Sequence, residues 1–178
     1  MSLCENIIGF KKQELSFLKT FKTNKNSYKY LSWFLKNSEQ FTEVNKQLSQ
    51  KVSTQVHARI KECYYNTWKA TWNRNYKYYE GFVWSKDVPI PLEHSWLTYN
   101  NKVIDPTMII PIKEVNKQLK RKYKGLQSEE NNRDRLGIDT EYVGVHIPTE
   151  TLNKFVQRES KTGAFLGDLF YQQELLTR

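Results

Sequence analysis

Residues 94–107 read HSWLTYNNKVIDPT, a stretch with the pattern of two short strands joined by a turn. Apolar and β-branched residues predict one strand over 92–99 and a second over 102–105. Asn100 and Asn101 stand between the two strands. Asparagine tolerates the positive φ values that a two-residue hairpin turn requires. The sequence therefore predicts a tight antiparallel hairpin at this point.

The hairpin also predicts which side chains meet. With Asn100 and Asn101 as the turn, Trp96 stands opposite Asp105, and His94 lies on the same face of the sheet. Diagonal neighbours of this kind are about 7–8 Å apart at the backbone, a gap that a carboxylate and an imidazole can close. We expect Asp105 to accept the ring N–H of His94 and to favour its protonated form. A slip of one residue would move Asp105 to the other face.

Cys63 opens a predicted helix over 62–72. A helix N-terminus stabilises a thiolate, and a nearby imidazolium lowers the thiol pKa further. Cys63, His94 and Asp105 would then supply the nucleophile, the base and the orienting acid of acyl transfer through a thioester. The backbone N–H of Cys63 is the expected oxyanion donor, and Gln55 is a second candidate from its position alone.

These residues resemble the transglutaminase-like branch of the papain-like cysteine enzyme superfamily, in its small bacterial and phage members. In that branch the order along the chain is Cys, His, Asp. The histidine stands in an H-x-W strand, and the aspartate stands in D-P-T at the end of the next strand. His94-Ser95-Trp96 and Asp105-Pro106-Thr107 match both motifs, and Cys63 matches the cysteine at a helix start. The resemblance covers about residues 55–110.

The resemblance implies a papain-like or transglutaminase-like α+β fold and a cysteine hydrolase or acyltransferase: a protease, amidase, deamidase or transglutaminase-like enzyme. Cys63 would attack an amide or isopeptide carbonyl of a protein or peptide-like substrate, His94 would carry the proton, and Asp105 would hold His94. Trp96 and Glu80 would line the substrate site, and a solvated strand edge is the other interpretation of Glu80. No cofactor is implied.

The whole chain, 1–178, fits one α+β domain with helices packed on a small antiparallel sheet. We expect a helical N-terminal part (1–50), a catalytic core (51–147) and C-terminal helices (148–178). The pattern predicts helices within 5–48, the last of them over 38–48, and helices at 62–72, after Pro148 and at 166–176. It predicts strands at 77–84, 92–99, 102–105 and 142–147, and a loop at Pro89 and Pro91.

Composition excludes several classes of protein. Aromatic residues make up 14% of the chain, which argues against disorder. A mean hydropathy of -0.75 and the lack of a long apolar run argue against a membrane helix. The two cysteines, Cys4 and Cys63, do not form a secreted disulfide pattern. With no signal-peptide pattern, these features favour the cytoplasm, or the host cytoplasm if the protein is phage-encoded.

A non-catalytic reading stays open. Cys63 could be an inert core residue, and His94 and Asp105 a stabilising pair. The net charge is +9, and the basic cluster 117–124 surrounds Tyr123, which is compatible with nucleic-acid binding or with a solvated helix face. A phage-encoded inhibitor that binds a host protein is a third alternative.

Metal and phosphate sites have little support in the sequence. His57 and His146 are not spaced from Cys63 as zinc ligands are, so no metal site is expected. The seven glycines are scattered and form no phosphate-binding loop.

Overall fold

The computed structural model describes residues 25–85, 88–110, 112–122, 140–160 and 162–176 of the 178 residues. Cys4, the first predicted helix within 5–48, Tyr123 and Lys124 lie outside this part. The described elements are α2 (Lys25–Asn37), β1 (Glu39–Phe41), α3 (Lys46–Gln55), α4 (Cys63–Ala70), β2 (Lys77–Ser85), β3 (Val88–Tyr99), β4 (Lys102–Ile104), α5 (Ile112–Lys122), β5 (Glu141–Ile147), α6 (Thr149–Glu159) and α7 (Leu166–Leu176).

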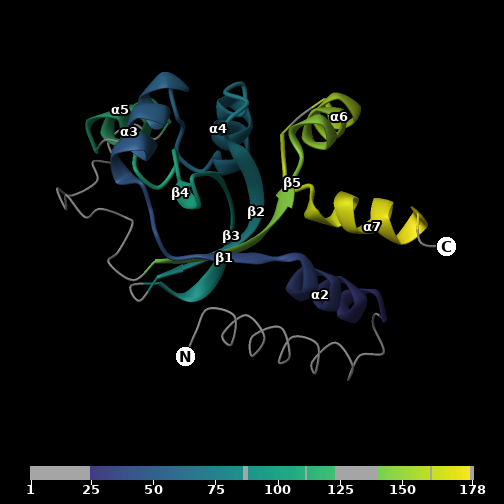
Figure 1. Cartoon of the computed structure of the whole chain (residues 1–178). Coiled ribbons are helices and arrows are strands. Elements are labelled where there is room, and N and C mark those ends of the chain that lie inside the picture. The colour runs from purple at the N-terminus through teal and green to yellow at the C-terminus, as the bar shows by residue number, and fades with distance from the viewer. Residues whose placement is uncertain (1–24, 86–87, 111, 123–139, 161, 177–178) are drawn as a thin grey trace.

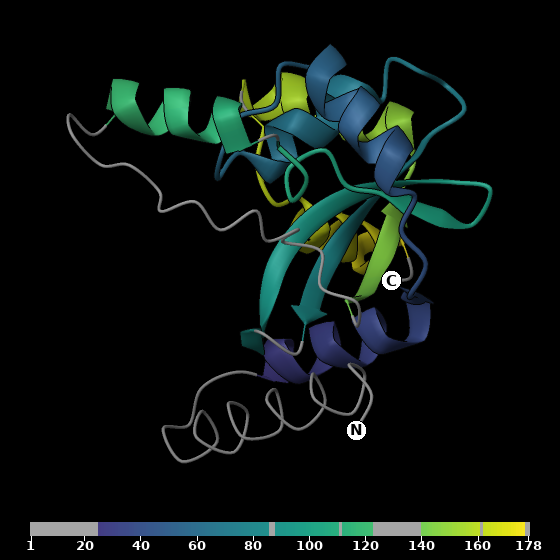
Figure 2. The same ribbon diagram turned by 90° about the vertical axis from the view of Figure 1, so that its left-hand side faces the viewer.

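A five-stranded antiparallel sheet in the order β1-β5-β2-β3-β4 forms the centre of the described part. Helices α3 and α5 lie near β4, and α6 and α7 lie near β5 (Figure 1). Figure 2 shows the strands edge to edge, with α7 behind them and α2 beneath. The prediction of an α+β fold with an antiparallel sheet is confirmed.

Alternation along the strands divides the buried side chains between two faces of the sheet. The larger cluster contains Tyr78, Leu97 and Val143 from the strands, together with core residues of all six described helices or their flanks. The smaller cluster is rich in aromatic rings and consists of Phe41, Tyr79, Val83, Trp96, Val103 and Tyr142. The predicted site residues His94 and Asp105 belong to this second face, because each is two residues away from a member of the smaller cluster. His94 precedes Trp96, and Asp105 follows Val103.

The hairpin has the predicted register. Leu97 pairs with Ile104, Thr98 with Val103 and Tyr99 with Lys102. Asn100 and Asn101 have φ values of 49° and 59°, as a two-residue turn requires. Trp96 therefore comes next in register opposite Asp105.

Two sequence predictions of local structure are wrong. The helix expected over 38–48 is instead strand β1, which pairs with β5, followed by α3. Asn45 caps α3, since its Oδ1 accepts the N–H of Leu48 at 3.0 Å. Pro89 and Pro91 lie in β3 rather than in a loop. β4 pairs only with residues 97–99, so within the described residues no strand pairs with the second edge of this part of β3, and proline is tolerated there.

Gly144 in β5 allows the Trp96 indole to lie against the sheet. A Cβ at Gly144 would lie 2.4 Å from Cη2 of Trp96 and 2.5 Å from the carbonyl oxygen of Glu80. We expect Gly144→Ala to lower the free energy of unfolding by about 1–3 kcal/mol, because neither neighbour can move away freely.

Urea denaturation measures the loss, and Gly163→Ala is the matched control because a Cβ there meets nothing within 4 Å. Equal stability of the two variants would contradict the close packing of Trp96 on Gly144.

No helix in the described part of the chain is both long enough and apolar enough to cross a membrane.

Candidate active site

The hairpin brings His94 and Asp105 into direct contact. Nε2 of His94 lies 2.7 Å from Oδ2 of Asp105. The two residues are 5% and 0% exposed, so the pair is shielded from water. The predicted pairing of this imidazole with this carboxylate is confirmed.

Asp105 is fixed by the backbone that follows it. Its Oδ1 accepts the N–H groups of Thr107 and Met108 at 2.9 and 3.0 Å. The hydroxyl of Tyr142 donates to Oδ2 at 3.0 Å, beside the bond from His94. Burial opposes ionisation of Asp105, but the His94 charge and these donors outweigh it and hold the pKa of Asp105 below its usual value. The carboxylate is therefore rigid and ionised at neutral pH.

Helix α4 places Cys63 against the free edge of β3. Ser95 is beyond the reach of β4, so its backbone groups face α4 rather than another strand. Thr67, one helical turn after Cys63, donates its hydroxyl to the carbonyl oxygen of Ser95 at 3.1 Å. The Ser95 hydroxyl in turn donates to the Thr67 hydroxyl at 3.2 Å, and the donors of Ser95 lower the pKa of the nearby Cys63 thiol. The bonds between Thr67 and Ser95 thus hold the start of α4 against β3, and this places the Cys63 thiol beside His94.

Asn66 connects the segments on either side of the site. Its Oδ1 accepts the N–H of Arg59 at 2.9 Å, and its Nδ2 donates to the Arg59 carbonyl oxygen at 2.7 Å. The same Nδ2 donates to the hydroxyl of Thr107 at 3.0 Å. The chain before Cys63 and the turn after Asp105 are therefore held by one buried amide.

The ionised forms of Cys63 and His94, a thiolate and an imidazolium, stabilise each other. Burial raises the pKa of the Cys63 thiol, but hydrogen bonding to His94, the His94 charge and the Ser95 donors outweigh burial, so this pKa lies below its usual value. Burial lowers the pKa of His94, yet Asp105 and Cys63 together raise it to about 10. A thiolate and an imidazolium therefore coexist between the two pKa values. Nε2 of His94 faces Asp105, which leaves Nδ1 for the sulfur.

Trp96 does not line a substrate site, and that prediction is wrong. Its side chain is 0% exposed. The indole stacks on Tyr79 with ring centroids 6.1 Å apart and meets Tyr142 edge-on at 5.1 Å. Trp96 supports the face of the sheet that carries His94, because a large aromatic residue in mid-strand packs against its cross-strand neighbours.

Glu80 does not line a substrate site or a solvated edge either, since it is 1% exposed. It pairs in register with Ser95, on the opposite face of the sheet from His94. Its Oε2 accepts the N–H groups of Phe165 and Leu166 at 2.7 and 3.0 Å. Glu80 therefore meets the start of α7, 85 residues further along the chain.

Gln55 is also misplaced by the sequence prediction. It lines a cavity together with Lys69, Ala70 and Trp72, at the end of α4 that is opposite to Cys63. It cannot reach an oxyanion beside the thiol. The backbone N–H of Cys63 stands at the helix start, where helical geometry leaves it without a partner in the helix.

Among the described residues, no group of three or more His, Cys, Asp or Glu side chains is arranged to hold a metal ion. His57 lines a surface cavity, and His146 packs on Tyr79 at 5.4 Å between ring centroids. The two histidines therefore lie in different parts of the molecule.

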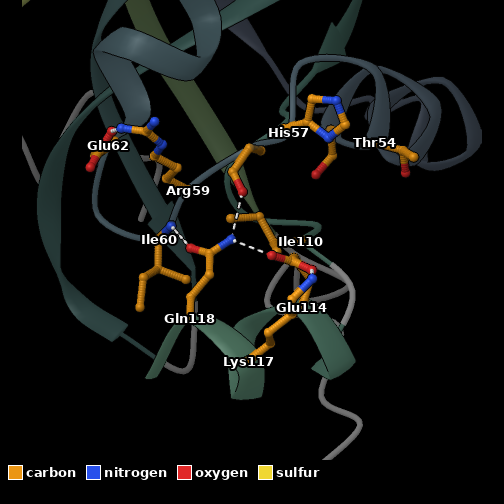
Figure 3. Close-up of a pocket in the computed structure, with 11 residues that line it drawn as sticks. Thr54, His57, Arg59, Ile60, Glu62, Ile110, Glu114, Lys117 and Gln118 are labelled. Atoms are coloured by element: carbon orange, nitrogen blue, oxygen red, sulfur yellow. Dashed lines mark hydrogen bonds and ion pairs between the residues drawn. The ribbon is translucent and has the colours of Figure 1, made fainter. Parts of the chain in front are cut away.

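A cavity of about 600 Å³ adjoins the residue before Cys63 (Figure 3). Its walls come from the end of α3, the segment 57–62 and α5, and they include Glu62 and Gln118. Gln118 joins two walls, since its Oε1 accepts the N–H of Ile60 at 2.9 Å and its Nε2 donates to the Ala58 carbonyl oxygen at 2.9 Å. The remaining lining residues that carry charge are Arg59, Glu114 and Lys117, and Lys117 begins the predicted basic cluster.

Sequence reasoning missed Ser95, Thr67, Asn66 and Tyr142. Ser95 stands inside the H-x-W motif, and alternation could have placed it on the face opposite His94. The other three form hydrogen bonds with partners that are 28 to 41 residues away in the chain, and no local sequence pattern predicts such bonds.

Comparison with known proteins found no matching family model, no matching curated protein and no matching solved structure.

Proposed function

We propose that this chain is a cysteine-dependent acyl-transfer enzyme of transglutaminase-like type. It hydrolyses or transfers an amide or isopeptide bond of a protein or peptide-like substrate through a thioester on Cys63. The single observation that carries the proposal is the buried hydrogen bond between His94 and Asp105 beside a thiol at the start of α4 whose pKa His94 lowers.

Each residue of this set has a defined part in the chemistry. The Cys63 thiolate attacks the amide carbonyl carbon, and the carbonyl oxygen takes the negative charge near the Cys63 backbone N–H. The C–N bond then breaks, and imidazolium His94 gives its proton to the leaving amine. Neutral His94 next removes a proton from water or from an acceptor amine, which attacks the thioester and releases the thiolate. Asp105 keeps Nε2 of His94 in place throughout.

Burial and exposure are suited to this chemistry. Asp105 and His94 are buried, so water does not compete for their hydrogen bond, whereas Cys63 is partly exposed and can be reached. The cavity beside Glu62 offers room for one side of a polypeptide substrate. A free thiol nucleophile favours a reducing compartment, so we place the enzyme in the cytoplasm, or in the host cytoplasm if it is phage-encoded.

The rate of iodoacetamide alkylation, measured across pH, tests the proposal. We expect Cys63 to react with an apparent thiol pKa below about 8.5, the value of an unperturbed cysteine. The reaction should persist into mildly acidic solution, because the thiolate is stabilised by protonated His94. Peptide mapping of the alkylated protein identifies Cys63 as the site.

An ordinary alkylation profile, with a thiol pKa near 8.5, would reject the enzyme and favour the binding alternatives. A fluorescent primary amine and a glutamine-containing protein then separate transfer from hydrolysis. Covalent attachment of the amine indicates transamidation, and release of ammonia without attachment indicates hydrolysis.

A further inference from the structure

The cavity beside Glu62 has a buried hydroxyl group in its wall. Ser53 of α3 lines the cavity and is 2% exposed, and its Oγ has no hydrogen-bond partner among the described residues. The next hydroxyl in the same wall, that of Thr54, already donates to the carbonyl oxygen of Gln50 at 3.0 Å. A buried polar group without a hydrogen bond is costly, so Ser53 marks a place where a ligand group can supply the partner.

The wall opposite α3 is held in place from two sides. Gln118 makes two hydrogen bonds to backbone groups of the segment 57–62, each at 2.9 Å (Figure 3). Asn66 bonds to both the N–H and the carbonyl oxygen of Arg59. The cavity volume of about 600 Å³ lies within the range of about 300–1,000 Å³ that is typical of ligand sites. The cavity is therefore large enough for a ligand and is formed in advance of binding.

The backbone of the same segment is unusual. His57 and Lys61 have φ values of 52° and 62°, in the left-handed region that favours glycine. Such residues keep this conformation only where the surrounding structure holds them in it, and they are frequent at ligand sites. The strain therefore supports a built wall rather than a gap left by loose packing.

The charged side chains of the lining form two pairs of opposite sign. Nη1 of Arg59 lies 3.5 Å from Oε2 of Glu62, and Nζ of Lys117 lies 3.8 Å from Oε2 of Glu114. These four charges cancel, so they give a charged ligand no net attraction. An apolar ligand group would leave the Ser53 hydroxyl without a partner. The lining therefore suits an uncharged group that forms hydrogen bonds.

We propose that this cavity is the specificity site of the enzyme, where Ser53 recognises an uncharged side chain of the polypeptide substrate that ends in a hydroxyl or carboxamide group. The inference rests on the proposed function of Cys63. The segment 57–62 leads directly into Cys63, so a substrate whose carbonyl carbon meets the thiol has neighbouring residues beside this segment. The aliphatic part of the recognised side chain packs on Ala58 and Ile110, which are 2% and 9% exposed.

Substitutions in the protein and in a peptide probe together test this contact. Tripeptides with an iodoacetyl group at the N-terminus, or a chloromethyl ketone at the C-terminus, alkylate Cys63 with the peptide on one side or the other of the reactive carbon. Each position is varied in turn from asparagine to leucine, which has a similar shape but no hydrogen-bonding group. The alkylation rate with asparagine, divided by the rate with leucine, is the quantity measured.

We expect this ratio to be about 2- to 10-fold higher in wild type than in Ser53→Ala at one position of the peptide, which is the effect of one neutral hydrogen bond. A variant that only changed the shape of the cavity, or the reactivity of the thiol, would change both rates alike. Ser53→Ala should fold, because the hydroxyl that it removes has no partner to lose among the described residues. Circular dichroism checks the fold, and Ser53→Gly takes its place if it does not fold.

Ser32→Ala is the matched control. It is the same substitution at an exposed serine of α2, outside the lining of the cavity. It should keep the wild-type ratio at every position of both probe series.

Ratios that are equal in wild type and in Ser53→Ala, at all positions of both series, overturn the inference. The proposed function is judged separately, from the reaction of wild-type protein with iodoacetamide. An ordinary thiol pKa for Cys63 defeats both, whereas a reactive Cys63 with equal ratios defeats only the role of Ser53.

Discussion

Replacement of Cys63 with serine is expected to reduce amide turnover by about 10⁴-fold or more, because a hydroxyl beside His94 does not ionise as the thiol does. Serine differs from cysteine by one atom, and it keeps a hydrogen-bonding group at the start of α4. The fold should therefore survive. Steady-state kinetics on an amide substrate measure the loss, and an electrophilic probe should no longer label the protein.

Cys4→Ser provides the control, because Cys4 and Cys63 are the two cysteines of the chain. It should leave both turnover and labelling at wild-type levels. Turnover that survives in Cys63→Ser while labelling is lost would mean that the reactive thiol is not the nucleophile. The acyl-transfer proposal would then be abandoned.

Replacement of Asp105 with alanine should have the largest effect on stability. It leaves His94 in a buried site without its carboxylate, and breaking a buried pair in this way costs about 3–5 kcal/mol. Asp105 raises the pKa of His94 by charge and by hydrogen bond, and burial lowers it. In the variant only Cys63 still opposes burial, so the pKa of His94 falls and the imidazolium that stabilises the thiolate is weakened.

The stability difference between wild type and Asp105→Ala should depend on pH with a definite sign. The pKa of His94 is raised to about 10 in the folded protein, so its contribution is complete below the unfolded value of about 6.5 and is lost as pH rises through 10. The pKa of Asp105 is lowered, so its contribution is present above about 3.9 and is lost as pH falls through the folded value.

Urea denaturation from pH 3 to pH 10 should therefore give the greatest difference between about pH 4 and pH 6.5. Tyr142→Phe is the control, since it removes one donor to Asp105 and leaves the ion pair. A difference that does not change with pH would contradict an ionised pair.

The sequence was most informative where the argument was local. Asn100 and Asn101 fix a two-residue turn, the turn fixes the register, and the register alone places His94 diagonally from Asp105. The two-residue repeat of side chains along β2 and β5 is an equally local signal. Both strands were predicted within one residue of their ends.

The failures involve partners that are distant in the chain. Three residues at 39–41 become a strand only because β5 lies beside them, about 100 residues later. Glu80 looks like a solvent-facing residue of an amphipathic strand, and its burial depends on two amides of α7. Gln55 was placed by distance along the chain from Cys63, which ignores the turn of the chain between α3 and α4.

The docking of α4 on β3 has a consequence for the behaviour of the chain in solution. An unpaired strand edge is a template to which another polypeptide can add, and the carbonyl of Ser95 belongs to such an edge. Thr67 and Cys63 occupy it. Any process that moves the first turn of α4 away from β3 would therefore separate the thiol from His94 and abolish its reactivity. The same movement would expose the strand edge and promote self-association of the chain.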